Sequence, residues 1–241
     1  MCRIYENFDA GRCCSFKIGG RIKKAAFPDS KEELIQLLQT GEYDLVLGSC
    51  TNVLFSSFGI NRNIIFTKKL NKFSIEGNKI KVYSGASGAA VSRAALKSGL
   101  SGFEFSIGLP GSFGGMIAMN ASAHSQAVSD CLVSAEVFDP ETKSVITLNK
   151  NELCFEYRNS IISRKNYIVL SADFEPAPAN PDDIYKRMQK NLEFRKQRQP
   201  LNYPNAGSIF KNPENTSAGA LLDLCGMKGE REGGAMVPEL H

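Results

Sequence analysis

The 241-residue chain has no tryptophan, only two histidines (His124 and His241) and no C-x-x-C pair. Two histidines cannot build a histidine metal cluster, and they leave few options for Ser-His-Asp or Cys-His catalysis. The odd number of cysteines argues against a disulfide framework or a zinc site. We therefore expect no metal, and we expect reduced, mostly buried thiols at Cys2, Cys13, Cys14, Cys50, Cys131, Cys154 and Cys225.

Long apolar runs and basic stripes are also missing. No segment has the length and apolarity needed to span a bilayer, and residues 1–7 do not form the apolar region of a signal peptide. These two features favour a cytoplasmic protein without a membrane partner. The net charge of +4 is not gathered in a Lys/Arg-rich stripe. This distribution does not favour nucleic acid and suits an anionic small-molecule substrate.

The pattern of helices and hairpins, without regular βαβ alternation, predicts an α+β protein. Ser30 and Glu33 form a capping box ahead of an apolar helix face, and Gly41 ends that helix. Hairpins are expected at residues 73–83 and 132–148. Further helices are expected at residues 85–99, 181–197 and 217–225, and strands at residues 16–20, 45–47, 63–67 and 167–174.

Residues 102–121 hold the densest group of backbone breakers. Gly108, Gly111, Gly114, Gly115 and Pro110 fall within eight residues, and an apolar segment follows at once. Such a stretch must turn tightly and expose N–H groups beside a helix start, where an anion such as a pyrophosphate can bind. A glycine-rich turn between two core elements explains the same pattern, so both interpretations stay open at this point.

Three other segments stand out. The apolar triplet 45–47 predicts a buried strand. Residues 48–52 form a polar turn after it, and this turn either meets a phosphate or ribose or is an ordinary β-turn. Pro176, Pro178 and Pro181 mark the best domain boundary. The helix beyond it has a basic outer face, and residues 205–213 form a second turn-rich motif.

Taken together, these motifs resemble the flavoprotein family of UDP-N-acetylenolpyruvoylglucosamine reductases. The similarity runs in order through residues 16–20, 48–55, 102–121, 157–160, 195–200, 206–213 and 218–223. It implies a two-lobed FAD-binding region of the PCMH/vanillyl-alcohol-oxidase type over residues 1–176, with lobes at about 1–68 and 69–176. A smaller α+β substrate domain is implied over residues 177–241. The short connection between residues 160 and 195 resembles the compact subtype.

The resemblance also implies a reaction in peptidoglycan precursor synthesis. NADPH reduces FAD, and the reduced flavin then reduces the enolpyruvyl ether of a UDP-sugar. The isoalloxazine is expected near Asn120 and Ala121, and the protein is expected to be a monomer. The FAD pyrophosphate is expected on Gly48, Ser49, Cys50, Thr51, Asn52, Gly108, Leu109, Pro110, Gly111, Ser112, Gly114 and Gly115.

By the same resemblance, Arg158 and Ser208 are the expected catalytic residues. A guanidinium can hold the substrate carboxylate while negative charge develops, and a serine hydroxyl can deliver the proton. Without the family, Arg158 reads as a surface ion pair and Ser208 as a turn hydroxyl. The expected substrate contacts are Tyr157, Arg158, Arg198, Lys211 and Asn212.

The sequence departs from the family pattern at three places. Cys50 and Ser122 stand where the family usually has glycine, and a side chain at position 50 could crowd the flavin phosphates. The family also carries a catalytic glutamate in a segment beyond the position that matches His241. An alternative to the active reductase is therefore a catalytically silent FAD-binding fragment. A weaker alternative is another oxidase of the same flavin fold.

Overall fold

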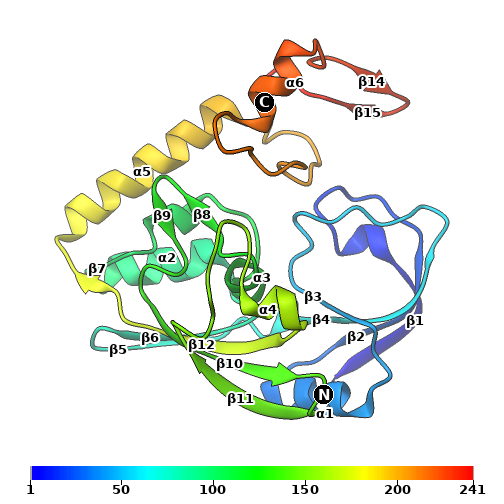
Figure 1. Ribbon diagram of the computed structural model, residues 1–241, viewed down its shortest axis with the longest axis vertical. Coiled ribbons are helices and arrows are strands. Elements are labelled where there is room, and N and C mark those ends of the chain that lie inside the picture. Colours follow the sequence, from blue (N-terminus) through cyan, green and yellow to red (C-terminus); the bar gives the residue numbers. More distant parts are fainter. Residues whose placement is uncertain (1, 241) are drawn as a thin grey trace.

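The body of the molecule contains two β-sheets, seen in the computed structural model, which describes residues 2–240 (Figure 1). The first sheet has the order β1-β2-β4-β3. Strand β1 runs antiparallel to β2, whereas β4 runs parallel to both β2 and β3. Its strands are β1 (Arg3–Asp9), β2 (Arg21–Phe27), β3 (Leu45–Leu47) and β4 (Ile60–Phe66).

The second sheet is antiparallel throughout and has the order β11-β10-β12-β6-β5. Its strands are β5 (Phe73–Glu76), β6 (Lys79–Tyr83), β10 (Leu132–Asp139), β11 (Ser144–Asn149) and β12 (Ile168–Phe174). Three helices belong to this half of the molecule: α2 (Gly88–Lys97), α3 (Phe113–Ala118) and α4 (Ile161–Lys165). Helix α3 contacts both β6 and β12, which fixes the glycine-rich loop in front of it over the sheet.

The largest core cluster lies under the glycine-rich loop. Phe103, Phe113 and Phe174 are fully buried, and their ring centroids lie 5.3–5.9 Å apart in tilted and edge-to-face contacts. Burying each such ring stabilises the fold by about 2–3 kcal/mol. A second cluster joins the sheets, because Ile65 of β4 packs with Phe138 of β10 in it. The two sheets therefore form one continuous support for the loops above them.

The chain then leaves the sheets along a long helix, α5 (Pro181–Arg198). This helix begins at Asn180, whose side chain accepts the N–H of Asp182, and has proline at its first position. Beyond it, α6 (Ala218–Leu224) and the small hairpin β14 (Arg231–Glu232) and β15 (Ala235–Met236) lie apart from both sheets (Figure 1). Two further strand pairs are short: β7 (Leu100–Ser101) with β13 (Ala177–Pro178), and β8 (Ser122–Ala123) with β9 (Gln126–Ala127).

A buried ion pair fastens α5 to the body. The Glu104 carboxylate accepts hydrogen bonds from Nε and Nη2 of Arg187 at 3.0 and 2.7 Å, and from the Gly102 N–H at 2.7 Å. Gln126 on β9 donates to the same carboxylate. Burial raises the pKa of Glu104, but the hydrogen bonds from Arg187 and Gly102 outweigh it, so the net pKa lies below the ordinary value. One carboxylate thus joins α5 to the β8–β9 hairpin.

Most sequence-predicted elements are confirmed, and two details are wrong. The Ser30 hydroxyl accepts the Glu33 N–H, and Gly41 ends α1 (Lys31–Thr40) in the left-handed region. Residues 16–20, predicted as a strand, contain no strand, because the ladder with β1 begins only at Arg21. Strand β3 was expected to be buried, but it is a sheet edge with Leu45 46% exposed. Within residues 2–240, no helix combines the length and apolarity needed to cross a membrane.

Candidate active site

Two loops that are distant in sequence face each other above the sheets. The first, residues 48–52, follows β3, and the second, residues 108–115, leads into α3. The Thr51 hydroxyl donates to the carbonyl of Pro110 at 3.1 Å. Gly48 lies so close to Ser112 that a Cβ at position 48 would overlap the Ser112 hydroxyl. Gly48 is therefore required for the close approach of the loops.

The paired loops present a set of uncommitted backbone donors. Within residues 2–240, no protein acceptor takes the N–H of Ser49, Cys50, Thr51, Asn52, Gly111, Ser112 or Gly115. Converging N–H groups beside a helix start can bind the oxygens of a pyrophosphate. Gly114 differs from Gly115, because its N–H donates to the Ser84 carbonyl at 2.8 Å and is not available to a ligand. Its place in the loop is explained by close packing, since a Cβ there would meet Ser84 Cβ at 3.0 Å.

Cys50 occupies an unusual backbone position in the first loop. Its φ is +50°, a region that favours glycine, and its side chain is buried beside Cys14 and Phe55. The thiol therefore points into the core of the first sheet and not toward the second loop. Burial raises the pKa of Cys50 to about 12, so the thiol is neutral at physiological pH.

Asn120 lies two residues after the end of α3. Its φ is +41°, and its side-chain amide donates to the carbonyl of Glu156 at 3.1 Å. Its side-chain oxygen is buried and has no hydrogen-bond partner within the described part of the chain. An orphaned buried acceptor indicates a donor from a ligand, because leaving such a group unpaired costs about 1–3 kcal/mol. The half-buried Ala121 follows it.

Arg158 sits at the third position of a tight turn whose end residues, Glu156 and Asn159, bond to each other through both backbone groups. Its φ is +55°, which costs energy in a non-glycine residue and often marks a functional site. Nη1 donates to the Ser122 hydroxyl at 3.1 Å, and the guanidinium carbon lies 5.3 Å from the centre of the Tyr157 ring. Among residues 2–240, no carboxylate pairs with Arg158. The guanidinium is thus held in place while its charge stays free for an anion.

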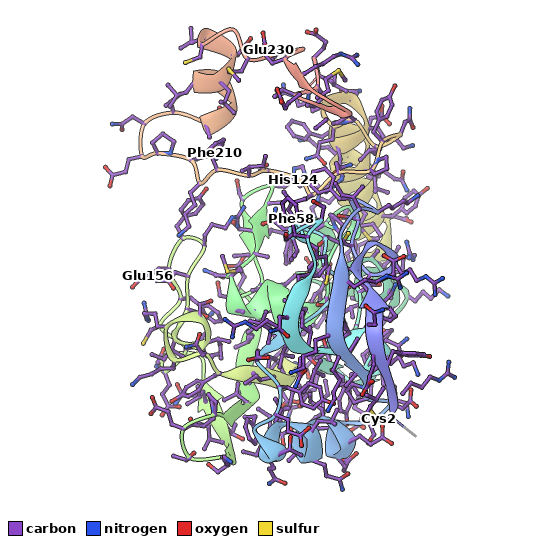
Figure 2. The ribbon with its side chains drawn as sticks, turned by 90° about the vertical axis from the view of Figure 1, so that its right-hand side faces the viewer. Cys2, Phe58, His124, Glu156, Phe210 and Glu230 are labelled. Atoms are coloured by element: carbon purple, nitrogen blue, oxygen red, sulfur yellow. The ribbon has the colours of Figure 1, made fainter. Side chains whose placement is uncertain are left out.

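The turn-rich segment 205–213 is hydrogen-bonded both to the first loop and to the Tyr157–Arg158 turn. The Asn52 side chain donates to the carbonyls of Ala206 and Ser208 at 2.6 and 2.9 Å. At the other end of the segment, the Asn212 N–H donates to the Tyr157 hydroxyl at 3.4 Å. Figure 2 shows the segment by its label Phe210, above the turn labelled Glu156. The segment 205–213 therefore links the first loop, at residues 206 and 208, to the Tyr157–Arg158 turn, at residue 212.

Two predicted substrate residues take no part in these hydrogen bonds. Arg198, the last residue of α5, lies with its guanidinium carbon 4.7 Å from the centre of the Phe194 ring. Lys211 is exposed and makes no hydrogen bond or ion pair with residues 2–240. Neither side chain makes a hydrogen bond with the Tyr157–Arg158 turn, so their expected role depends on the groups of a bound molecule that reach them.

A cavity of about 420 Å³ opens between the β8–β9 hairpin and α5. Gly108 and Leu109 of the second loop line one side, and Asn191 and Arg195 of α5 line the other. Burial lowers the pKa of Arg195. The cavity also includes His124, whose ring meets that of Phe194 edge to face at 5.3 Å. In the part of the chain that the structure describes, no group of His, Cys, Asp and Glu side chains could hold a metal ion.

Sequence reasoning found the loops but missed three residues that support the site: Ser122, Glu104 and Arg187. Ser122 was noted only as a departure from glycine, yet it contacts Arg158. No local signal marks Glu104 and Arg187 as partners, because they are 83 residues apart. Asn52 was expected at a flavin phosphate, and its side chain has a contact that was not expected, with the segment around Ser208.

Comparisons with known proteins identify the family. Residues 22–148 match the model of an FAD binding domain, and residues 199–241 match that of the C-terminal domain of UDP-N-acetylenolpyruvoylglucosamine reductase. The reductase of Caldicellulosiruptor bescii is 41% identical over 94% of this chain and 74% of its own length. That of Caldanaerobacter subterraneus is 39% identical over 99% of this chain and 80% of its own length.

Solved structures agree on the fold. The crystal structure of the Thermus caldophilus reductase covers 100% of this chain and 86% of its own, with 28% identity and a TM-score of 0.86. Berberine bridge enzyme from Eschscholzia californica covers 75% of this chain and 41% of its own, with 14% identity and a TM-score of 0.54, a likeness of fold alone. The predicted α+β, FAD-binding fold is confirmed. The chain belongs to the family of UDP-N-acetylenolpyruvoylglucosamine reductases, FAD-dependent oxidoreductases.

Proposed function

We propose that this protein reduces UDP-N-acetylenolpyruvoylglucosamine to UDP-N-acetylmuramate, with NADPH as the hydride donor. The observation that carries the proposal is the meeting of three separate segments. Asn52 bonds to Ser208 from the first loop, and Asn212 bonds to Tyr157 beside Arg158. These contacts bring a proton-donating hydroxyl and an unpaired guanidinium to the rim of the loops that suit FAD.

The FAD pyrophosphate is proposed to lie between the two facing loops. The free N–H groups of residues 49–52, with those of Gly111, Ser112 and Gly115, offer the donors that its oxygens need. The orphaned side-chain oxygen of Asn120 is suited to the N–H edge of the isoalloxazine. Gly48 and Pro110 hold the two loops together, Gly114 packs against Ser84, and Gly108 and Leu109 line the cavity beside α5. Ala121 is proposed to line the ring.

When bound, FAD supplies a hydride to the β-carbon of the enolpyruvyl double bond after accepting one from NADPH. This addition places negative charge on the α-carbon beside the substrate carboxylate. Arg158 is proposed to hold that carboxylate through two N–H groups, and its fixed positive charge stabilises the developing enolate. The absence of a carboxylate partner among the described residues keeps the guanidinium available for this task.

Ser208 is proposed to deliver the proton from its Oγ to the α-carbon. Ser208 is exposed, and Asn52 donates to its backbone carbonyl at 2.9 Å, so the backbone that carries the hydroxyl is tied to the first loop. A serine is a weak acid and works only when its hydroxyl is held against the reacting carbon. In this proposal the Asn52 contact places the backbone of Ser208, and the bound substrate completes the approach to the hydroxyl.

The substrate is proposed to lie over the segment 205–213, with Tyr157 and Asn212 against it. Arg198 and Lys211 carry positive charges that suit the UDP phosphates, and both remain exposed. We also propose the division at residue 176, with lobes at about 1–68 and 69–176, because each of the two large sheets draws its strands from one lobe. We further propose that the enzyme is a monomer.

The proposal is tested by steady-state oxidation of NADPH with and without the enolpyruvyl UDP-sugar. The FAD-loaded protein is expected to oxidise NADPH rapidly only when the UDP-sugar is present. Arg158→Ala and Ser208→Ala should each lower kcat by about 10²–10⁴-fold while FAD stays bound. A protein that binds FAD but never couples NADPH oxidation to the UDP-sugar would favour the silent FAD-binding alternative. Oxygen consumption with alcohols would favour an oxidase.

A further inference from the structure

Ser122 contacts the guanidinium of Arg158 from a different element of the fold. It is the first residue of β8, and its hydroxyl accepts a hydrogen bond from Arg158 Nη1 at 3.1 Å. Strand β8 pairs with β9 through Ser122 and Ala127, so the backbone that carries the hydroxyl is fixed. The hydroxyl is half-buried and lies two residues after Asn120, which bonds to Glu156 in the turn of Arg158.

Arg158 needs such an anchor because little else restrains its side chain. Its backbone is held in the left-handed region by the turn, and the Tyr157 ring lies below the guanidinium at 5.3 Å. Within residues 2–240, the Ser122 hydroxyl is its one hydrogen-bond partner. A free arginine samples many rotamers and must lose that freedom when it grips a carboxylate. The bond from Nη1 to Ser122 restrains the side chain before the ligand binds, which reduces this loss of freedom, and it leaves the other N–H groups of the guanidinium without a partner among residues 2–240.

We infer that Ser122 is a positioning residue that aims Arg158 at the carboxylate of the enolpyruvyl group. The inference rests on the proposed function, because it takes the enolpyruvyl UDP-sugar as the ligand. A positioning role and a purely structural role predict different effects on ligand binding. Loss of the hydroxyl weakens the binding of a UDP-sugar that carries the carboxylate and leaves the binding of one without it unchanged.

The experiment is isothermal titration of the FAD-loaded protein with two ligands, UDP-N-acetylenolpyruvoylglucosamine and UDP-N-acetylglucosamine, which lacks the enolpyruvyl group. Ser122→Ala is expected to raise the Kd of the first ligand by about three- to tenfold and to leave that of the second unchanged. Ser122→Thr keeps the hydroxyl and should restore most of the binding. Ser129→Ala is the matched control, because the Ser129 hydroxyl makes no hydrogen bond with residues 2–240.

A double variant separates positioning from direct contact. In the Arg158→Ala background, Ser122→Ala should have no further effect on the Kd of the enolpyruvyl ligand. Equal weakening of both ligands, or an unchanged Kd of the enolpyruvyl ligand, overturns the role of Ser122 while the proposed function stands. If the unaltered protein binds the enolpyruvyl ligand no better than UDP-N-acetylglucosamine, both the inference and the carboxylate contact of Arg158 are wrong.

Discussion

Replacing Arg187 by alanine should destabilise the fold, because it leaves a buried carboxylate without its cation. Glu104 is 1% exposed, and both Nε and Nη2 of Arg187 bond to it. Removing one partner of a buried ion pair costs about 3–5 kcal/mol. Because the Arg187 side chain is 46% exposed, water can replace part of the interaction. We therefore expect Arg187→Ala to lower the free energy of unfolding by about 2–3 kcal/mol.

In a chain of this size, that loss corresponds to a fall in melting temperature of roughly 4–12 °C. Thermal unfolding followed by circular dichroism measures it. Lys186→Ala is the control on the same helix, since its pair with Asp183 is exposed and should shift the melting temperature by no more than about 1 °C. The double variant Glu104→Gln/Arg187→Met also removes the buried negative charge, so its melting temperature should lie above that of Arg187→Ala. If Arg187→Ala shifts the melting temperature no more than Lys186→Ala, the reasoning is refuted.

Three further predictions concern the loops and the pH. Gly48→Ala should push Ser112 away and weaken FAD binding by about tenfold or more, whereas Gly219→Ala, which has open space around it, should keep the flavin absorbance per protein unchanged. Asn52→Ala loses both hydrogen bonds to the segment around Ser208 and should lower kcat about tenfold. An unchanged kcat would show that Asn52 does not position Ser208 for catalysis. The pKa of Glu104 is lowered despite its burial, so its stabilisation is complete above about pH 4–5 and is lost as the pH falls through the folded-state value. The melting temperatures of the unaltered protein and Glu104→Gln should converge in acid, and a constant difference would contradict this.

Elements with strong local signals could be predicted from the sequence. The capping box of Ser30 and the turn at Gly77 fix α1 and the β5–β6 hairpin through contacts within a few residues. Strand β1 escaped prediction, because its pairing with β2 and not its own pattern makes it a strand. The exposure of β3 depends on its place at the edge of the sheet, and the order of strands in a sheet cannot be predicted from the periodicity of the sequence.

The site could be predicted only in its separate parts. Glycine spacing marked both loops, because close approach and tight turns restrict the residue type. The bond from Asn52 to Ser208 spans 156 residues, and the bond from Arg158 to Ser122 spans 36, so neither leaves a local pattern. The left-handed backbone of Arg158 and of Cys50 was equally invisible, since neither residue type favours it. These long-range contacts are what turn three motifs into one site.

The most direct test of the central claim follows the flavin itself. Protein whose FAD has been reduced by NADPH without oxygen is mixed with the enolpyruvyl UDP-sugar, and the absorbance of oxidised flavin is recorded. Oxidised flavin should return rapidly, and Arg158→Ala should slow this return by about a hundredfold or more. Flavin that stays reduced in the presence of the UDP-sugar, or that is reoxidised equally fast without Arg158, would contradict it.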